Sequence, residues 1–394
     1  MGHGLLDAGP PAGRPPPSHR TDPEGNPVKL TKLGRTAVVA AAGALLLSSC
    51  AANEPAAPAG SESSAPESTL SGDLAGAGAS SMGAAQEAWI AGFQTANEAV
   101  NITYDPAGSG AGREQFIAGG VSFAGSDAYL DDEELAGTFG ACVADTLPVD
   151  LPVYISPIAI IFNVEGVDSL NMDAATIAGI FSGEITNWND EAIAAQNEGV
   201  ELPDARITAV HRSDDSGTTE NFTQYLAANA ADAWTEGEFE TWPAAYGGEG
   251  AQGTSGVVDA VTNGTNTIGY ADASRAGDLG TVALQVGEEY VPFTAEAAAA
   301  AVDASPLVEG RHEGDIAVEL DRTTTENGAY PLVLISYAIA CTEYNDAAQA
   351  ELVKAYLSYI ASEEGQQAGA DNAGSAPISD DLRAQIEASI EMIK

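Results

Sequence analysis

Residues 153–164 read VYISPIAIIFNV, and this run points to the class of fold. Its side chains are almost all apolar, whereas a strand with one face in water alternates apolar and polar side chains. A continuous apolar run of this length is typical of a strand that is covered on both faces. The run therefore predicts a buried strand whose sheet has both faces covered.

Helix-like and strand-like stretches alternate on both sides of this run. Upstream, helical spacing of apolar residues over 82–93 is followed by strand-like alternation over 100–104. Downstream, residues 207–210 and 332–340 are strand-like, and residues 352–360 have the pattern of an amphipathic helix. This alternation predicts an α/β fold.

The chain has 394 residues and is strongly acidic, with 14 Lys and Arg against 58 Asp and Glu and a formal net charge of -44. Proteins that bind nucleic acid or anionic lipid surfaces need clustered basic residues, so neither class fits this chain. The hydrophobic fraction of 44% is nevertheless enough to build packed cores. The length corresponds to two domains or to one large domain.

The N-terminal region has the pattern of an export signal. Residues 29–50 read KLTKLGRTAVVAAAGALLLSSC, in which basic residues precede an apolar run that is too short to span a membrane. The end of this run resembles a lipobox, so we expect residues 1–49 to be a signal peptide and Cys50 to carry lipid; a spare thiol after an ordinary signal peptide is the alternative. Residues 50–71 predict a flexible tether. The sequence thus predicts an extracytoplasmic domain that is lipid-anchored to the cell membrane.

The two remaining cysteines, Cys142 and Cys341, can form a disulfide in that oxidising compartment. Their spacing does not show whether they meet, so two free buried thiols are the alternative. The cysteines and histidines have no zinc spacing, and the acidic residues 131–134 lack the EF-hand pattern. We therefore expect neither a metal nor a cofactor.

Three polar loops share one design. Residues 80–81 (SS) open a predicted helix, and residues 108–112 (GSGAG) and 213–219 (SDDSGTT) each lead from a strand into a helix. Small residues leave backbone N–H groups uncovered, hydroxyls add donors, and the start of a helix carries partial positive charge. If they converge, such loops form a cradle for an anion.

Each loop alone has an ordinary explanation, because Ser and Thr commonly cap helices and Gly is common in turns. Their repetition, together with Arg212 in a chain with so few basic residues, favours a binding site. The planar guanidinium of Arg212 fits a tetrahedral oxyanion in a bidentate manner. A structural ion pair, for example with Asp214, is the alternative.

These residues resemble a known family, the substrate-binding protein of the high-affinity phosphate ABC transporter (the PstS family). The matching segments keep the family's order across residues 72–394, and they are LAGAGASS (74–81), GSGAG (108–112), FAGSDAY (123–129), ITNW (185–188), VHRSDDSGTT (210–219) and IGY (268–270). The resemblance implies a two-lobed type II periplasmic-binding-protein fold that closes on one inorganic phosphate in the cleft between the lobes. It also implies a protein without catalytic activity that delivers phosphate to the membrane permease subunits of an ABC importer.

The resemblance further implies the lobes and the site residues. Residues 72–153 and 330–394 would form lobe I, and residues 154–329 would form lobe II. The residues that would bind phosphate are Ser80, the Ser81 backbone N–H, Ser109 and Asp127 from lobe I, and Arg212, Ser216, Gly217 and Thr218 from lobe II, with Asp214 orienting Arg212.

Asp127 is the most informative of these residues, because a carboxylate repels an oxyanion unless a proton lies between them. Phosphate carries such a proton at neutral pH and sulfate does not, so Asp127 predicts discrimination against sulfate. A helix cap after Ser126 is the alternative. Asp215 stands where the family commonly has Gly, a position that could need the left-handed backbone that Asp tolerates. We expect the Asp215 side chain to point to solvent.

Other functions compete with phosphate transport: binding of another oxyanion, a secreted phosphoester hydrolase with the same anion cradle, and a non-catalytic surface adhesin. His211, Asp214 and Ser216 suggest a hydrolase at first sight. Residues so close in one loop do not easily align as base, orienting acid and nucleophile, and the G-x-S-x-G turn is absent. We therefore expect no enzyme activity.

Overall fold

The structure is a computed structural model, and it describes residues 69–394. The predicted signal peptide (1–49), the predicted lipid-bearing Cys50 and the predicted tether up to residue 68 lie outside the described residues. Within 69–394, we find no helix with both the length and the apolar character that a membrane crossing requires.

Helices and strands alternate along the described chain. The elements before the long apolar strand and that strand itself are β1 (Gly72–Gly78), α1 (Gly83–Ala96), β2 (Val100–Asp105), α2 (Ser109–Ile117), β3 (Phe123–Ser126), α3 (Asp132–Leu135) and β4 (Pro148–Asn163). The elements that follow it are β5 (Ser169–Met172), α4 (Ala174–Ser182), α5 (Glu191–Ala194), β6 (Thr208–Arg212), α6 (Gly217–Asn229), β7 (Glu249–Ala251), α7 (Gly253–Asn263), β8 (Thr267–Asp272), η1 (Ala273–Arg275), β9 (Gly280–Val286), β10 (Glu289–Val291), α8 (Ala295–Asp303), β11 (Val333–Cys341), α9 (Ala347–Ala361), α10 (Glu363–Ala373) and α11 (Asp380–Glu391).

Hydrogen bonds join the strands in the order β2-β1-β3-β11-β4-β8-β6-β7, with β9 also pairing with β4, β5 and β10. The first part of β4, residues 148–157, pairs antiparallel with β11, and its second part, residues 158–163, pairs antiparallel with β8. We call β1, β2, β3 and β11 the first strand group, and β5 to β10 the second strand group. The strand β4 therefore runs from one group into the other.

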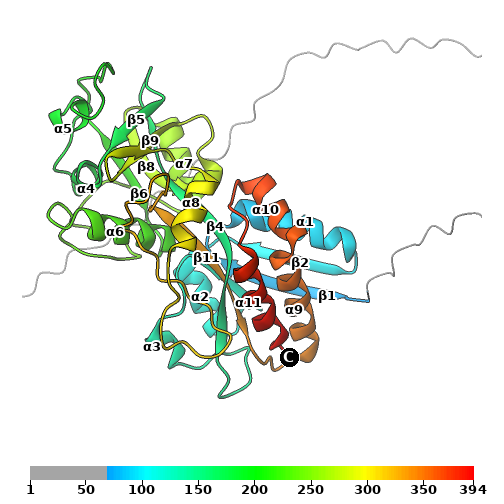
Figure 1. The fold of residues 1–394 in the computed structure, drawn as a ribbon. Coiled ribbons are helices and arrows are strands. Elements are labelled where there is room, and N and C mark those ends of the chain that lie inside the picture. Colours follow the sequence, from blue (N-terminus) through cyan, green and yellow to red (C-terminus); the bar gives the residue numbers. More distant parts are fainter. Residues whose placement is uncertain (1–68) are drawn as a thin grey trace, which may run out of the picture. The chain divides into compact units, whose positions relative to one another are not determined.

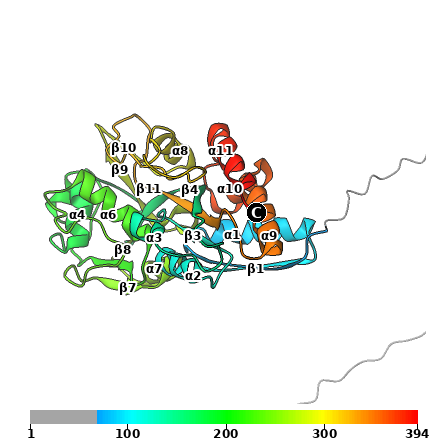
Figure 2. The same cartoon turned by 90° about the horizontal axis from the view of Figure 1, so that it is seen from below.

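The predicted buried strand is confirmed, because every residue of β4 from 148 to 162 is buried. The chain returns to the first group at its C-terminal end, where α9 contacts β1, and α10 packs on α1 (Figures 1 and 2). Helices α4, α6 and α7 pack within the second group (Figure 1). Helices therefore cover the strands of both groups, and the α/β class is confirmed.

Large aromatic side chains fill the interior on both sides of the junction. In the first group Trp89 and Phe123 are buried, and the Phe123 ring centroid lies 5.6 Å from that of Tyr356 in helix α9. In the second group Phe222 stacks on Tyr270 at 4.3 Å. Burying one such side chain stabilises a fold by about 1.5–3 kcal/mol. The buried apolar residues of both groups form one continuous core, and a smaller cluster lies between β4, β6, β8 and α7.

The predicted pairing of Cys142 with Cys341 is confirmed by a disulfide with a Cα–Cα distance of 5.3 Å. It joins the loop after α3 to the last residue of β11, across 199 positions of sequence. The alternative of two free thiols is therefore wrong. A disulfide that closes so long a loop restricts the unfolded chain and stabilises the first group.

Candidate functional site

The predicted site residues lie where the two strand groups meet. Ser80 and Ser81 follow β1 in the turn that precedes α1, so they lie just before this helix and not in its first turn. The other predicted residues lie at the start of α2 (Ser109), after β3 (Asp127), at the end of β6 (Arg212), after that end (Asp214), and at the N-cap and start of α6 (Ser216, Gly217, Thr218). Segments far apart in sequence are thus brought to one place.

Asp127 lies at the centre of this cluster and is 4% exposed. Ser81 Oγ donates to Asp127 Oδ1 at 2.6 Å, and Thr218 Oγ1 donates to Asp127 Oδ2 at 2.9 Å. The Asp127 backbone N–H donates to Ser109 Oγ at 3.1 Å. Hydroxyls from both strand groups therefore meet at one carboxylate, which is not the side-chain helix cap of the alternative interpretation.

The environment of Asp127 acts on its pKa in two directions. Burial raises the pKa of this carboxyl, and hydrogen bonds from Ser81, Ser336 and Thr218 oppose the rise, as does the nearby Arg212 charge. The net pKa lies above the ordinary value. Hydroxyl donors aimed at both oxygens favour the charged form, which is the form that accepts a proton from a ligand.

Arg212 is buried, at 2% exposed, and Asp214 holds it in place. Arg212 Nε donates to Asp214 Oδ1 at 2.8 Å, Arg212 Nη2 donates to Asp214 Oδ2, and Arg212 Nη1 reaches Thr218 Oγ1 at 3.4 Å. Although burial acts to raise it, the bonds to Arg212 lower the pKa of Asp214. The predicted ion pair therefore exists, and it fixes a guanidinium beside the Asp127 cluster.

Two glycines allow the loops to approach closely. A Cβ on Gly217 would lie 2.7 Å from both Asp127 Cβ and Ser109 Oγ, and a Cβ on Gly108 would lie 2.7 Å from Asp214 Oδ2. Gly108 also has φ +110°, which favours glycine. The helix starts of α2 and α6 therefore come together only because these positions carry no side chain.

Two predicted residues have other partners in the structure. Ser216 Oγ accepts from the Thr219 backbone N–H at 3.1 Å, which is an ordinary N-cap. Ser80 Oγ lies 3.0 Å from Thr254 Oγ1 and accepts from the Thr254 backbone N–H at 3.0 Å. Ser80 thus connects β1 to the start of α7.

Helix α7 is a part of the site that the sequence analysis missed. The Gly253 backbone N–H donates to Asp214 Oδ1 at 2.9 Å, and Thr254 contacts Ser80. Residues 253–256 read GTSG, a small polar loop of the same kind as residues 108–112. This similarity is the sequence feature that could have identified the loop. No basic residue lies beside it, in contrast to Arg212 beside residues 213–219.

Ser336 was also missed. It lies in β11, is fully buried, and its Oγ donates to Asp127 Oδ1 at 2.7 Å. Strand β11 reads VLISYAIAC, in which this hydroxyl stands among apolar side chains. A buried hydroxyl needs a partner, and its position opposite β3 supplies Asp127.

The Asp215 side chain is exposed as expected, and it accepts a hydrogen bond from Thr241 Oγ1. Its backbone is not left-handed, because the positive-φ residues other than glycine in the described chain are Asp145 and Asn266. The conformation considered for this position is therefore wrong: a loop with Asp here keeps φ negative.

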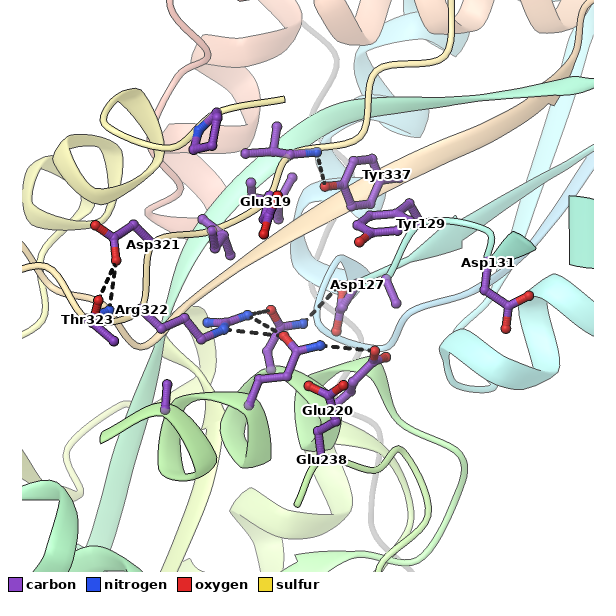
Figure 3. Close-up of a pocket in the computed structure, with 18 of the residues that line it drawn as sticks. Asp127, Tyr129, Asp131, Glu220, Glu238, Glu319, Asp321, Arg322, Thr323 and Tyr337 are labelled. Carbon is purple, nitrogen blue, oxygen red and sulfur yellow. Dashed lines mark hydrogen bonds between the residues drawn. The ribbon is translucent and has the colours of Figure 1, made fainter. Parts of the chain in front are cut away.

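A cavity of about 820 Å³ opens beside Asp127 and has a different character (Figure 3). Besides Asp127, its lining carboxylates are Asp131, Glu220, Glu238, Glu319 and Asp321. Its buried Arg322 donates to neutral oxygens, including Gln224 Oε1 at 2.9 Å, and burial lowers the pKa of Arg322 to about 10. So many carboxylates disfavour an oxyanion here, although the cavity is large enough to hold one.

The hydrolase interpretation has no geometric support in the described residues. His211 Nδ1 contacts the Arg212 carbonyl oxygen at 2.8 Å, and its ring stacks on Trp242 at 4.7 Å. Ser216 Oγ is bound to a backbone N–H, as described above. Within residues 69–394 we also find no group of three or more His, Cys, Asp or Glu residues that could hold a metal ion.

Comparison with known proteins identifies relatives. Residues 63–364 match the family described as PBP superfamily domain. Phosphate-binding protein PstS 3 of Mycobacterium tuberculosis is 32% identical over 376 residues, which cover 93% of this chain and all of the relative. The PstS 2 protein of the same species is 31% identical with the same coverage, and PstS of Xylella fastidiosa is 31% identical over 82% of this chain and 86% of its own.

Solved structures share the fold. A periplasmic phosphate-binding protein (PfluDING) bound with phosphate superposes with a TM-score of 0.64 at 24% identity, covering 80% of this chain and 93% of that one. A phosphate ABC transporter substrate-binding protein from Clostridium perfringens gives a TM-score of 0.55 at 22% identity, with 78% and 100% covered. The PstS relatives are phosphate-binding proteins by name. This α/β chain belongs to the PstS family of phosphate-binding proteins.

Proposed function

We propose that this protein binds one inorganic phosphate at the junction of its two strand groups and delivers it to an ABC importer. The observation that carries the proposal is the position of Asp127, a buried carboxylate surrounded by hydroxyls and close to Arg212. The relatives named above are phosphate-binding proteins, which supports the same ligand here.

The site residues would divide the work by chemistry. Arg212, held by Asp214, supplies a positive charge and two donors to the phosphate oxygens. The turn before α1 and the starts of α2 and α6 supply donors to the phosphate: backbone N–H groups, with hydroxyls from Ser80, Ser109 and Ser216. The residues concerned are Ser80, Ser81, Ser109, Ser216, Gly217 and Thr218, of which Ser81 and Thr218 direct their hydroxyls to Asp127. The strongly acidic chain repels phosphate at long range, and solvent ions screen this repulsion. Capture would therefore depend on these donors at contact distance.

Asp127 would supply selectivity. It can accept the proton of hydrogen phosphate or dihydrogen phosphate, whereas sulfate at neutral pH would set two acceptors against each other. A missing donor in a dry polar site can lower affinity by factors of about 10⁴. Phosphate and its close analogue arsenate are therefore the preferred ligands, and another oxyanion without a proton is the weaker alternative.

We further propose that lobe I comprises residues 72–153 and 330–394 and that lobe II comprises residues 154–329. The path of β4 supports a division within this strand, since residues 148–157 pair with β11 and residues 158–163 pair with β8, so the change of partner lies four residues beyond the proposed boundary. Motion of the lobes about β4 and β11 would open the site to phosphate and close it again. The permease subunits would then bind the surface of the closed form.

We also propose that the protein acts outside the cytoplasmic membrane, anchored by lipid at Cys50. The disulfide between Cys142 and Cys341 fits an oxidising compartment. Cell fractionation tests the anchor: the wild type is expected in the membrane fraction and Cys50→Ala outside it. Recovery of Cys50→Ala in the membrane fraction to the same extent as the wild type would exclude the anchor.

Titration calorimetry tests the ligand. We expect saturable heat with phosphate and arsenate at pH 7 and none with sulfate at the same concentrations. Tight sulfate binding would point to the other-oxyanion alternative, and the absence of heat with all three anions would refute the proposed function.

A further inference from the structure

Arg113 is a buried arginine that forms partly buried ion pairs at the junction of the two strand groups. It lies in α2, which packs on β1 and β3 of the first group. Arg113 Nη1 and Nη2 donate to Glu240 Oε1 and Oε2 at 2.9 and 2.8 Å, and Arg113 Nε donates to Glu134 Oε1 at 2.8 Å. Its side chain is 10% exposed. One guanidinium is thus shared between two carboxylates.

The two carboxylates come from different parts of the fold. Glu134 lies in α3, which follows β3 of the first group. Glu240 lies in the loop between α6 and β7 of the second group. The Phe239 backbone N–H of this loop donates to Thr223 Oγ1 of α6 at 3.1 Å. The bidentate pair with Glu240 therefore joins the two groups, whereas the pair with Glu134 stays within the first.

The pair with Glu240 is connected directly to the candidate binding loops. The Ser216 backbone N–H at the start of α6 donates to the Glu240 carbonyl oxygen at 3.2 Å. On the other side, Arg113 lies one turn of α2 beyond Ser109 and also donates to Ser126 Oγ at 3.0 Å, next to Asp127. Separation of the two groups would break this ion pair together with the anion contacts.

The chemistry favours a strong interaction. Although burial acts to lower it, the bonds to Glu240 and Glu134 raise the pKa of Arg113 above its usual value. A second ion pair, Arg275 with Glu87, also joins the groups, but its atoms lie 3.7 Å apart and its side chains are 37% and 73% exposed. Exposed pairs of this kind contribute little, so Arg113–Glu240 is the stronger of these two pairs.

Arg311 and Asp150 also form a buried pair across the proposed lobe boundary. The further partners of this pair are Leu130 and Asp315, not the candidate binding loops.

We propose that Arg113 and Glu240 form a latch that holds the two strand groups closed around the bound anion and sets the rate at which phosphate is released. The inference rests on the proposed function, because it concerns phosphate release. Removing one partner of a buried, hydrogen-bonded charge pair acts mainly on dissociation, whereas association rates vary less among variants of one site.

The test compares two glutamates that contact the same guanidinium. Glu240→Gln removes the charge that crosses the junction, and Glu134→Gln removes the charge on the near side. Their distances to Arg113 are equal at 2.8 Å, and their side chains are 22% and 21% exposed. Release of radiolabelled phosphate after addition of excess unlabelled phosphate gives the dissociation rate. We expect it to rise about tenfold or more in Glu240→Gln and to change less than about twofold in Glu134→Gln.

Each outcome decides between explanations. Equal release rates in the wild type and Glu240→Gln would overturn the latch. Equal acceleration in Glu240→Gln and Glu134→Gln would also overturn it, because loss of either glutamate would then act only by loosening Arg113. A wild type that binds no phosphate would instead refute the proposed function. If Glu240→Gln does not fold, Glu240→Asp replaces it, since this change keeps the charge and shortens the side chain; faster release from Glu240→Asp supports the latch, and an unchanged rate opposes it.

Discussion

The Asp127 cluster and the acid-lined cavity lie side by side, and Asn221 touches both, since its Nδ2 donates to the Asp127 carbonyl oxygen at 2.8 Å (Figure 3). In the cluster, one carboxylate is surrounded by hydroxyls, helix starts and Arg212. In the cavity, several carboxylates surround one arginine that contacts neutral oxygens. Under the proposed function, the balance of donors and acceptors, and not the volume of a cavity, determines where the anion binds.

Removing Arg212 is expected to have the largest effect on the cluster. Arg212→Ala takes away the positive charge and leaves Asp214 without its partner. Truncating one partner of a hydrogen-bonded charge contact costs about 2–5 kcal/mol in binding, so phosphate affinity should fall by about 10² or more. Calorimetry measures the effect, and the exposed Arg206, which lines a separate cavity, is the control. Equal losses in Arg212→Ala and Arg206→Ala would mean that general charge, and not the cluster, holds phosphate.

Changing Asp127 tests selectivity. Asp127→Asn replaces a proton acceptor by an amide that can also donate. The ratio of phosphate affinity to sulfate affinity should therefore fall by about 10-fold to 100-fold, through weaker phosphate binding or stronger sulfate binding. The control is Glu319→Gln, an exposed carboxylate of the cavity, which should leave both affinities unchanged. Calorimetry with both anions measures the ratio. An unchanged ratio in Asp127→Asn would remove this residue from the selectivity mechanism.

Ser336→Ala tests the hydroxyl that the sequence analysis missed. It removes one donor to Asp127 Oδ1, for which a loss of about 1 kcal/mol, or about fivefold in phosphate affinity, is expected. Ser336→Thr keeps a hydroxyl and should restore part of the affinity. The control is Ser156→Ala, which removes a buried hydroxyl on β4 that donates to the Pro157 carbonyl oxygen. If both alanine variants bind phosphate equally well, Ser336 is only a packing residue.

Glu220 in the cavity wall should affect stability and not binding. Burial, and next the charge of Glu240, raise its pKa to about 8. Because its pKa is raised in the folded state, protonated Glu220 stabilises the fold relative to the ionised form. This stabilisation is fully present below the ordinary pKa near 4.5 and is lost as the pH rises through about 8. Glu220→Gln should therefore lose less stability than the wild type between pH 5 and 9, by about 1 kcal/mol or a few degrees in Tm. Thermal melts at both pH values measure this, and parallel losses would contradict the assignment.

Local patterns predicted much of the fold. The apolar run at 153–164 became the buried strand β4, and the alternation of periods became the helices and strands of an α/β fold. The disulfide could only be offered as a possibility, because pairing of Cys142 with Cys341 depends on where the C-terminal strand returns. Local sequence patterns predict the individual helices and strands. The order of the strands depends on contacts between distant segments, which local patterns do not contain.

The candidate site likewise contains residues that local sequence indicates and residues that it does not indicate. Small polar loops at helix starts are local features, so they could be recognised, and the structure brings them together. Ser336, Thr254 and the Arg113–Glu240 pair depend on strand pairing and loop packing across more than 100 residues, and no local pattern marks them. The contact of the Asp215 side chain with Thr241 likewise joins positions 26 residues apart, and no local pattern marks it.

A crystal structure of the protein grown with phosphate at neutral pH tests the central comparison most directly. The proposed function predicts a tetrahedral anion within hydrogen-bond distance of Asp127 and Arg212, at the starts of α2 and α6. An anion bound to Arg322 in the acid-lined cavity, or a phosphate at the junction that does not touch Asp127, would contradict it.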